Sequence, residues 1–315
     1  GGNTGTATAT PSGGTPGYTY SWSNTQTTQT ATGLTSGTYT VTVRDANNCS
    51  ITSSVTITQP TAVSASISSS TNVSCNGGSN GSATVSASGG TPSYTYTWSN
   101  SQTTATATNL AAGTYTVTVK DNNNCSTTTS ITITQPTALN ASFSATNTSC
   151  NGGTNGTATA TPSGGTSPYT YYWFPSAQTS QTATNLAAGT YNVTITDNKG
   201  CTKTGTATVS QPAALSLTMS KTDATCGNSN GSASVSVSGG TSPYTYLWSN
   251  TSTSNSITNV TAGTYSVTVT DNHGCTNVNN VAVNNTGAPT VSVNSVTNVT
   301  CNGGTNGAAS ISASG

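Results

Sequence analysis

Charge is scarce in this sequence of 315 residues. Glutamate is absent, and five basic and five acidic residues make up 3% of the chain, with a net charge of zero. Nucleic-acid binding requires a basic surface, and cationic partners require an acidic one. The composition therefore excludes both kinds of partner as the basis of function, and Thr, Ser and Asn must keep the outer faces wet.

Other absences remove further classes. No run of about 18 apolar residues is present, so we expect no membrane span in this segment. His273 is the only histidine, and the eight cysteines are too widely spaced for a zinc site. Paired carboxylates for glycoside hydrolysis and a base beside a nucleophile are missing. We therefore expect no metal, no cofactor and no enzymatic activity.

What the sequence does contain is a repeat. The string Cys75-Asn-Gly-Gly-Ser-Asn-Gly81 returns, with small changes, at Cys150, Cys226 and Cys301, and tryptophans recur at the same period of about 76 residues. A period this long indicates one small domain per copy. We interpret the chain as a stretch of a longer array, with a truncated repeat at 1–60, full repeats at 61–136, 137–212 and 213–289, and the start of another at 290–315.

Each repeat has the pattern of short antiparallel strands. In the second repeat, alternation of apolar and polar residues predicts strands at 63–67, 83–87, 94–98, 104–110, 115–119 and 130–134, separated by Gly, Asn and Pro turns. Helical periodicity is absent, and Thr, Val, Tyr and Ile suit pleated, half-buried surfaces. The sequence predicts an all-β fold: tandem immunoglobulin-like antiparallel sandwiches in a linear array.

Two aromatic positions define the expected core of each repeat. A tryptophan ends the third strand, where immunoglobulin-like sandwiches keep a core Trp, and a tyrosine opens the fifth, as a tyrosine corner does. The remaining core positions are mostly Ala and Val, so the aromatic residues supply much of the buried area. The predicted core residues are Trp22, Trp98, Trp173 and Trp248 with Tyr39, Tyr115, Tyr191 and Tyr265.

The cysteines fall into an early and a late position in each repeat. Small secreted domains normally carry their own disulfide bonds, which favours pairing within a repeat. Cys49 and Cys301 would then have partners outside the chain. The pairs within a repeat are Cys75–Cys125, Cys150–Cys201 and Cys226–Cys275.

An alternative pairing links neighbouring repeats. In an immunoglobulin-like topology, the early and late cysteines of one repeat lie at opposite ends of the sandwich, whereas bonded Cα atoms lie within about 7 Å. In a head-to-tail array, an early cysteine would meet the late cysteine of the next repeat, which gives Cys75–Cys201 and Cys150–Cys275. Both pairings remain open from the sequence.

An aspartate begins the turn before each late cysteine, at Asp45, Asp121, Asp197 and Asp271. Asp and Asn oxygens suit calcium, but one carboxylate per turn gives little charge for a tight site. These residues also cap turns and tolerate left-handed backbone conformations. We therefore interpret the four aspartates as turn residues and not as calcium ligands.

The combined strings resemble the SprB repeat. They are Cys75-Asn-Gly-Gly, Ser88-Gly-Gly-Thr-Pro-Ser-Tyr-Thr-Tyr-Thr-Trp98 and Asn109-Leu-Ala-Ala-Gly-Thr-Tyr-Thr-Val-Thr-Val119, followed by Asp121 to Cys125. The resemblance covers nearly the whole chain. The fourth repeat departs most, with Cys226-Gly-Asn and with Thr286-Gly-Ala-Pro289 in place of Thr-Gln-Pro.

This resemblance implies an extracellular role. The family occurs in large cell-surface adhesins of gliding Bacteroidetes bacteria, exported by the type IX secretion system. We expect a stalk or filament segment that acts in adhesion and gliding motility. Its expected partners are neighbouring repeats, other copies in a filament, and surface polysaccharide or substratum. The alternative is a carbohydrate- or surface-ligand-binding module whose repetition raises avidity.

Overall fold

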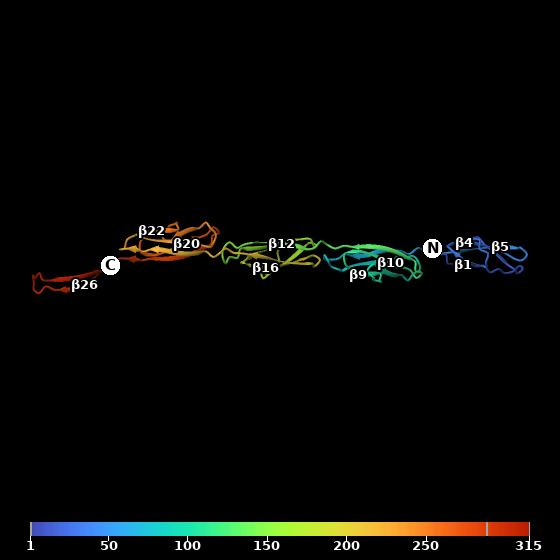
Figure 1. Cartoon of the computed structure of the whole chain (residues 1–315), viewed down its shortest axis with the longest axis horizontal. Coiled ribbons are helices and arrows are strands. Elements are labelled where there is room, and N and C mark those ends of the chain that lie inside the picture. Colours follow the sequence, from blue (N-terminus) through green and yellow to red (C-terminus); the bar gives the residue numbers. More distant parts are fainter. Residues whose placement is uncertain (1, 288, 315) are drawn as a thin grey trace. The chain divides into compact units, whose positions relative to one another are not determined.

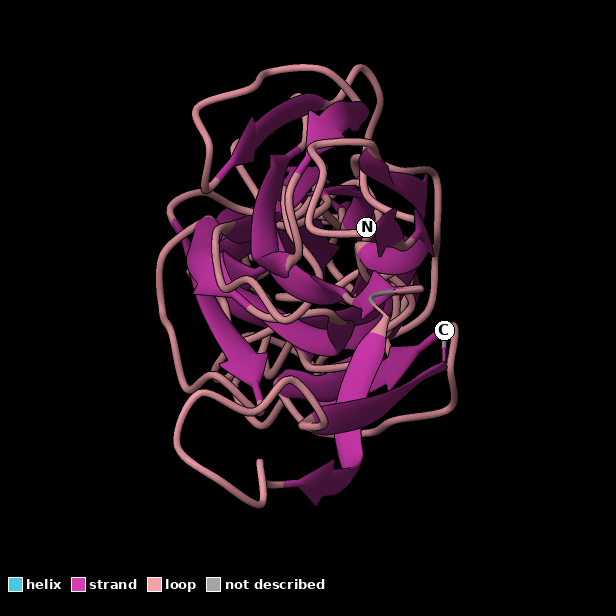
Figure 2. Ribbon diagram, turned by 90° about the vertical axis from the view of Figure 1, so that its left-hand side faces the viewer, coloured by secondary structure: helices cyan, strands magenta, loops and turns pink. Residues whose placement is uncertain are grey.

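The computed structural model describes residues 2–287 and 289–314, and every regular element in these residues is a β-strand (Figures 1 and 2). The predicted all-β fold is therefore confirmed. The chain divides into two compact units, Gly1–Pro136 and Thr137–Gly315. The boundary falls between the second and third repeats.

The second repeat, in the first unit, shows the complete topology. One sheet has the order β6-β7-β9, and the other has the order β11-β10-β8, with antiparallel pairing throughout. The first, second and fourth strands thus form one sheet, and the third, fifth and sixth form the other, which is an immunoglobulin-like arrangement. The strands are β6 (Ser64–Thr71), β7 (Gly81–Ser88), β8 (Thr95–Trp98), β9 (Thr106–Leu110), β10 (Gly113–Lys120) and β11 (Ser126–Ile133).

The first repeat has the same two sheets, but residues 2–60 hold no counterpart of β6. Its first sheet consists of two paired strands, β1 and β3, and its second has the order β2-β4-β5. These strands are β1 (Gly5–Thr8), β2 (Thr19–Trp22), β3 (Thr30–Leu34), β4 (Gly37–Arg44) and β5 (Ser50–Ile57).

The second unit contains the third and fourth repeats. Their sheets have the orders β12-β13-β15 and β14-β16-β17, then β18-β20-β22 and β21-β23-β24. The third repeat has β12 (Asn140–Thr146), β13 (Gly156–Ser163), β14 (Tyr169–Phe174), β15 (Thr182–Leu186), β16 (Gly189–Asp197) and β17 (Thr202–Val209). The fourth has β18 (Ser216–Thr222), β20 (Gly231–Ser238), β21 (Thr245–Trp248), β22 (Ser256–Val260), β23 (Gly263–Thr270) and β24 (Thr276–Val283).

Two smaller features complete the second unit. A short parallel pair joins β19 (Ala224–Thr225) to β25 (Asn285–Thr286) within the fourth repeat. An antiparallel hairpin of β26 (Thr290–Thr297) and β27 (Ala308–Ser314) follows. The hairpin exposes apolar side chains on its surface, including Val291, Val293 and Ile311.

A single tryptophan lies at the centre of each sandwich. Trp22, Trp98, Trp173 and Trp248 are 0–4% exposed. In each repeat, the indole N–H donates to a backbone carbonyl just before the fourth strand, at 2.9–3.0 Å, on Thr28, Thr104, Ser180 and Ser254. Each indole is therefore buried with its polar atom satisfied, as a buried Trp requires.

The four tyrosines lie at the edge of this core. Tyr191 is buried, whereas Tyr39, Tyr115 and Tyr265 are only partly buried. Three of the hydroxyls donate to a carbonyl four residues upstream, as in a tyrosine corner, with O···O distances of 3.0–3.2 Å. The fourth, on Tyr39, contacts the Thr35 hydroxyl at 3.1 Å. The tyrosines thus secure the turn before the fifth strand.

The aspartate turns join the last hairpin to the loop between the second and third strands of the same repeat. In the third repeat, Oδ1 of Asp197 accepts the N–H groups of Lys199 and Cys201, and Oδ2 accepts that of Thr166. Burial of Asp197 acts to raise its pKa, but the backbone donors act against it and hold the pKa below its ordinary value. The same contacts recur at Asp45, Asp121 and Asp271. Both carboxylate oxygens are occupied by N–H donors, which supports the turn interpretation.

Gly156 gives a test of how tightly the strands pack. A Cβ atom at this position would lie 2.5 Å from Cγ1 of Val209 and 2.8 Å from the carbonyl oxygen of Leu186. We expect Gly156→Ala to destabilise the third repeat by about 1–3 kcal/mol, because the backbone must shift. Hydrogen exchange of peptides from β13 and β15 measures the loss.

Gly189→Ala is the matched control in the same repeat. Its Cβ atom would meet only the Tyr191 ring, at 3.8 Å. We expect exchange in this variant to match the parent chain. Equal exchange in both variants would contradict the packing argument.

The pKa of Asp197 predicts acid sensitivity. Because the folded pKa is lower than the unfolded value of about 3.9, the carboxylate stabilises the fold above that pH, and the contribution disappears as pH falls through the folded pKa. Asp197→Asn should lower the melting temperature at pH 7 and reduce its change below pH 4, since an amide N–H₂ cannot accept from Thr166. Asn198→Ala, at an exposed turn position, should keep the parent profile. A profile for Asp197→Asn as steep as the parent's would refute this assignment.

Candidate functional site: the disulfide junction of the third and fourth repeats

The chain leaves the third repeat beside the end of its first strand. After β12 and after β17, two segments run alongside each other and are joined by hydrogen bonds, which we call the exit tie (residues 147–152 with 210–212). The donors and acceptors are Thr148 N to Ser210 O (3.0 Å), Ser210 N to Asn147 Oδ1 (2.9 Å), Gly152 N to Gln211 Oε1 (2.7 Å) and Asn151 Nδ2 to Pro212 O (3.1 Å).

Cys150 lies in this exit tie, within a loop that its neighbours hold rigid. Gly153 N donates to Cys150 O at 3.0 Å. The Asn155 side chain closes the loop, because its Oδ1 accepts from Ser149 N at 3.0 Å and its Nδ2 donates to Ser149 Oγ at 2.8 Å. The repeated Asn-Gly string therefore fixes the early cysteine at the exit end of its sandwich.

Cys275 lies at the entry end of the fourth repeat, just after the turn between β23 and β24. Oδ1 of Asp271 accepts from Cys275 N at 2.9 Å, and Asp271 N donates to Cys275 O at the same distance. Oδ2 accepts from Thr241 N, while the adjacent Gly240 N donates to Ala213 O. The aspartate turn thus positions the late cysteine where the chain enters the repeat.

These two ends meet in a disulfide bond. Cys150 and Cys275 are joined with a Cα–Cα distance of 5.7 Å across a sequence separation of 125 residues. Sγ of Cys275 also lies 3.5 Å from Ser149 O. A hollow of about 480 Å³ surrounds the bond and is lined by both repeats and by Pro212 and Ala213 of the linker. Covalent bonds therefore cross this junction twice, once through the linker and once through sulfur.

The favoured pairing within each repeat is wrong for the bonds that the structure shows. Cys150 does not pair with Cys201, and Cys275 does not pair with Cys226, because Cys150 and Cys275 bond to each other. Cys125 and Cys226 are free, which also excludes Cys75–Cys125 and Cys226–Cys275. The physical reason is that eight-residue strands of about 27 Å separate the two ends of one sandwich. The alternative, pairing between neighbours, describes Cys150–Cys275.

The remaining cysteines fall into two groups. Cys75 and Cys201 are also disulfide-bonded. Cys49, Cys125, Cys226 and Cys301 are free and exposed.

The exit tie itself was not predicted, although its signal was present in the repeated Gln-Pro. It recurs in the second repeat, where Val73 N donates to Thr134 O and Gly77 N donates to Gln135 Oε1. In the fourth repeat, Asn285 Oδ1 accepts from Gly227 N at 2.8 Å in place of the glutamine. The departure of this repeat from the pattern therefore leaves the tie intact.

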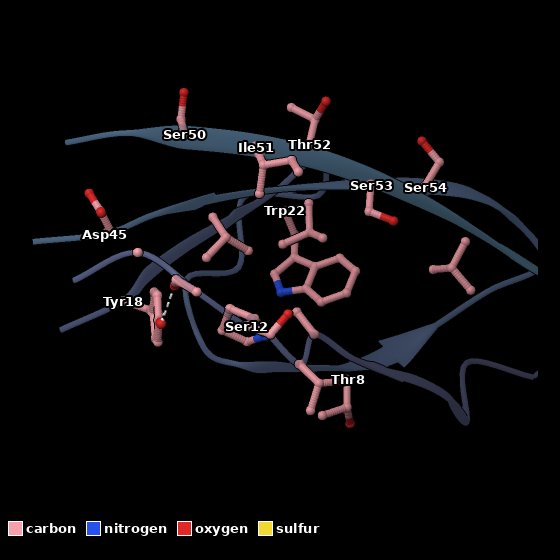
Figure 3. A pocket seen from close by; sticks show the side chains of 18 of the residues that line it. Thr8, Ser12, Tyr18, Trp22, Asp45, Ser50, Ile51, Thr52, Ser53 and Ser54 are labelled. Atoms are coloured by element: carbon pink, nitrogen blue, oxygen red, sulfur yellow. Dashed lines mark hydrogen bonds between the residues drawn. The ribbon is translucent and has the colours of Figure 1, made fainter. Parts of the chain in front are cut away.

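A larger groove lies in the first repeat, over Trp22 and between the two sheets (Figure 3). Its volume is about 730 Å³, and Ile51, on β5 at its rim, is 72% exposed. In the other repeats, the first strand (β6, β12 or β18) lies beside the second strand and packs against the last. The groove occupies the position of that strand, so we do not interpret it as a ligand site.

Little in the structure suggests catalytic chemistry. Within residues 2–287 and 289–314, no cluster of three His, Cys, Asp or Glu side chains could hold a metal ion. The same residues form no helix that could cross a membrane. His273, the single histidine, contributes its backbone N–H to Asp271. The Cys150–Cys275 junction is therefore the candidate site, and its role is to connect the third and fourth repeats.

Comparison with solved structures gives tandem immunoglobulin domains. The eight N-terminal Ig domains of Down syndrome cell adhesion molecule align over 95% of this chain at 11% identity with a TM-score of 0.28, and this chain spans 60% of that structure. Four Ig domains of Dscam1 isoform 7.44 align over 85% of this chain and 90% of theirs, at 9% identity and a TM-score of 0.22. These values are too low to support any argument about function.

Comparison with protein families gives a direct match. A search of curated proteins finds none that matches. The SprB repeat matches four times, at residues 1–27, 67–103, 142–178 and 218–253. Each match contains the region from the second strand to the tryptophan, or most of it, and the spacing of the matches follows the period of the chain. The chain therefore belongs to the SprB repeat family.

Proposed function

We propose that this chain is a stalk or filament segment of a large secreted cell-surface adhesin. The observation that carries the proposal is the Cys150–Cys275 bond, which joins neighbouring repeats and leaves each sandwich without a bond of its own in the second unit. A disulfide between neighbours restricts the junction, which a spacer needs and a ligand-binding module does not. Family membership supports the extracellular location, export by type IX secretion, and a role in adhesion and gliding.

We also propose that each repeat is a separate domain, with the boundaries 61–136, 137–212 and 213–289. Four apolar clusters support this division, because each draws its residues from one repeat. In this arrangement, an early cysteine pairs with the late cysteine of the following repeat throughout the array.

The competing function is repeated binding of carbohydrate or another surface ligand. Tyr172 and Phe174 favour it, since both are more than half exposed on the same face of β14. The equivalent positions beside the other tryptophans hold small or aliphatic residues, such as Thr97 with Ser99 and Leu247 with Ser249. A pair of exposed aromatic side chains that is present in one repeat only cannot raise avidity through repetition. The stalk is therefore the better-supported function.

Disulfide mapping tests the junction. Peptic digestion at low pH without reductant prevents thiol exchange and should release a peptide containing Cys150 linked to one containing Cys275. Reduction should separate the two masses. A link between Cys226 and Cys275 would instead restore the pairing within a repeat and remove the main support for the stalk.

Deletion of one whole repeat tests the stalk in the bacterium that produces the protein. Removing residues 137–212 keeps the order of early and late cysteines, so we expect normal export and a shorter array. Attachment of cells to a surface should fall because reach is lost, while antibody labelling of intact cells stays unchanged. Attachment that is independent of repeat number would contradict a spacer function.

A glycan array with the full chain distinguishes the two functions. We expect no saturable binding. Saturable, specific binding that is lost in a Tyr172→Ser, Phe174→Ser variant would favour the ligand-binding module over the stalk. Leu247→Ser is the matched control, because it removes an exposed side chain at the equivalent position of the next repeat.

A further inference from the structure

Tension at the junction can be transmitted along either of two covalent connections, the peptide chain or the Cys150–Cys275 bond. Along the peptide, force entering at Thr137 must pass through every strand of both repeats before it leaves at Thr286. Through sulfur, it passes from Thr137 to Cys150 and from Cys275 to Thr286, which bypasses the 125-residue separation between the cysteines. The shorter covalent route becomes taut first and therefore carries the load.

The strands on the short route are already extended. β12 (Asn140–Thr146) leads to Cys150, and β24 (Thr276–Val283) follows directly after Cys275. A β-strand rises about 3.3 Å per residue, close to the limit of about 3.3–3.6 Å for a fully stretched chain. Pulling on both ends of such a strand yields almost no extra length.

Both strands are held along their whole length. β12 pairs with β13 from Asn140 to Thr146, and β24 pairs with β23 from Thr276 to Val283. In the fourth repeat, Nδ2 of Asn277 also donates to the carbonyl of Leu215, just before β18, at 2.7 Å, and Nδ2 of Asn279 donates to that of Leu217 in β18 at 3.1 Å. Tension along either strand loads these hydrogen bonds together, because the bonds lie across the direction of pull.

We propose that the Cys150–Cys275 bond makes this pair of repeats an extension-limited tether. Under tension, β12, the disulfide and β24 bear the load, and the cores around Trp173 and Trp248 lie off the load path and stay folded. This inference rests on the proposed stalk function, to which it adds a mechanism. The apolar cores then need only to keep the strands in register, while covalent bonds set the length.

Single-molecule pulling on the full 315-residue chain, held at its two ends, tests the proposal. One variant keeps Cys150 and Cys275 and has serine at the other six cysteines, and its matched partner has serine at all eight. With a separation of 125 residues at about 3.4 Å each, the oxidised chain should release about 420 Å less length. It should also show two fewer unfolding steps, since the third and fourth repeats are shielded.

Reductant added to the first variant should restore the missing length and steps. Equal lengths before and after reduction would overturn the proposal, as would short steps of about a dozen residues that show β12 and β24 peeling from their sheets. Either result concerns the load path alone. The stalk function stands or falls separately, on attachment of the repeat-deletion strain and on the glycan array.

Discussion

The length of the strands is the constraint on which the structure depends. It determines which cysteines come close enough to form a disulfide bond. Strands β20, β23 and β24 are each eight residues long, which is about 27 Å. Cys226 in the exit tie and Cys275 beyond the entry turn therefore lie at opposite ends of one sandwich. The bonded Cα atoms of Cys150 and Cys275 lie 5.7 Å apart, and only the end of a neighbouring sandwich comes that close. Bonding between repeats follows from this geometry.

Local patterns in the sequence predicted most of the fold. Alternation of apolar and polar residues located all six strands of the second repeat, and the places of Trp98 and Tyr115 on their strands indicated the immunoglobulin-like topology. These signals are local because the side-chain period of a strand is a property of the strand itself. Cysteine pairing is not local: it depends on which ends of two sandwiches face each other. General experience with small secreted domains therefore favoured the wrong partner for Cys150.

The exit tie shows how a sequence can depart from its pattern and keep its structure. In the third repeat, Asn147 and Gln211 supply side-chain oxygens that accept backbone N–H groups. In the fourth, Asp223 accepts from Asn284 N at 2.8 Å, and Asn285 replaces the glutamine. The tie thus requires an acceptor oxygen at each position and not a particular residue. Asn285 therefore makes in the fourth repeat the contact that Gln211 makes in the third, although the residues differ.

The charge-poor composition and the Ala-rich core fit a division of roles within the repeat. The apolar core stabilises the fold, whereas the strands and the disulfide bond set the length under tension. The core around Trp173 uses Ala158, Ala160 and Ala183, which bury little area each. Such a core would be a weak element if it had to resist tension directly. In the load path that we propose, β12, the disulfide and β24 resist tension, and the core of the third repeat needs only to hold β12 beside β13. A charge-poor, Thr-rich sandwich with one tryptophan is sufficient for that task, and it can be repeated without adding larger apolar side chains.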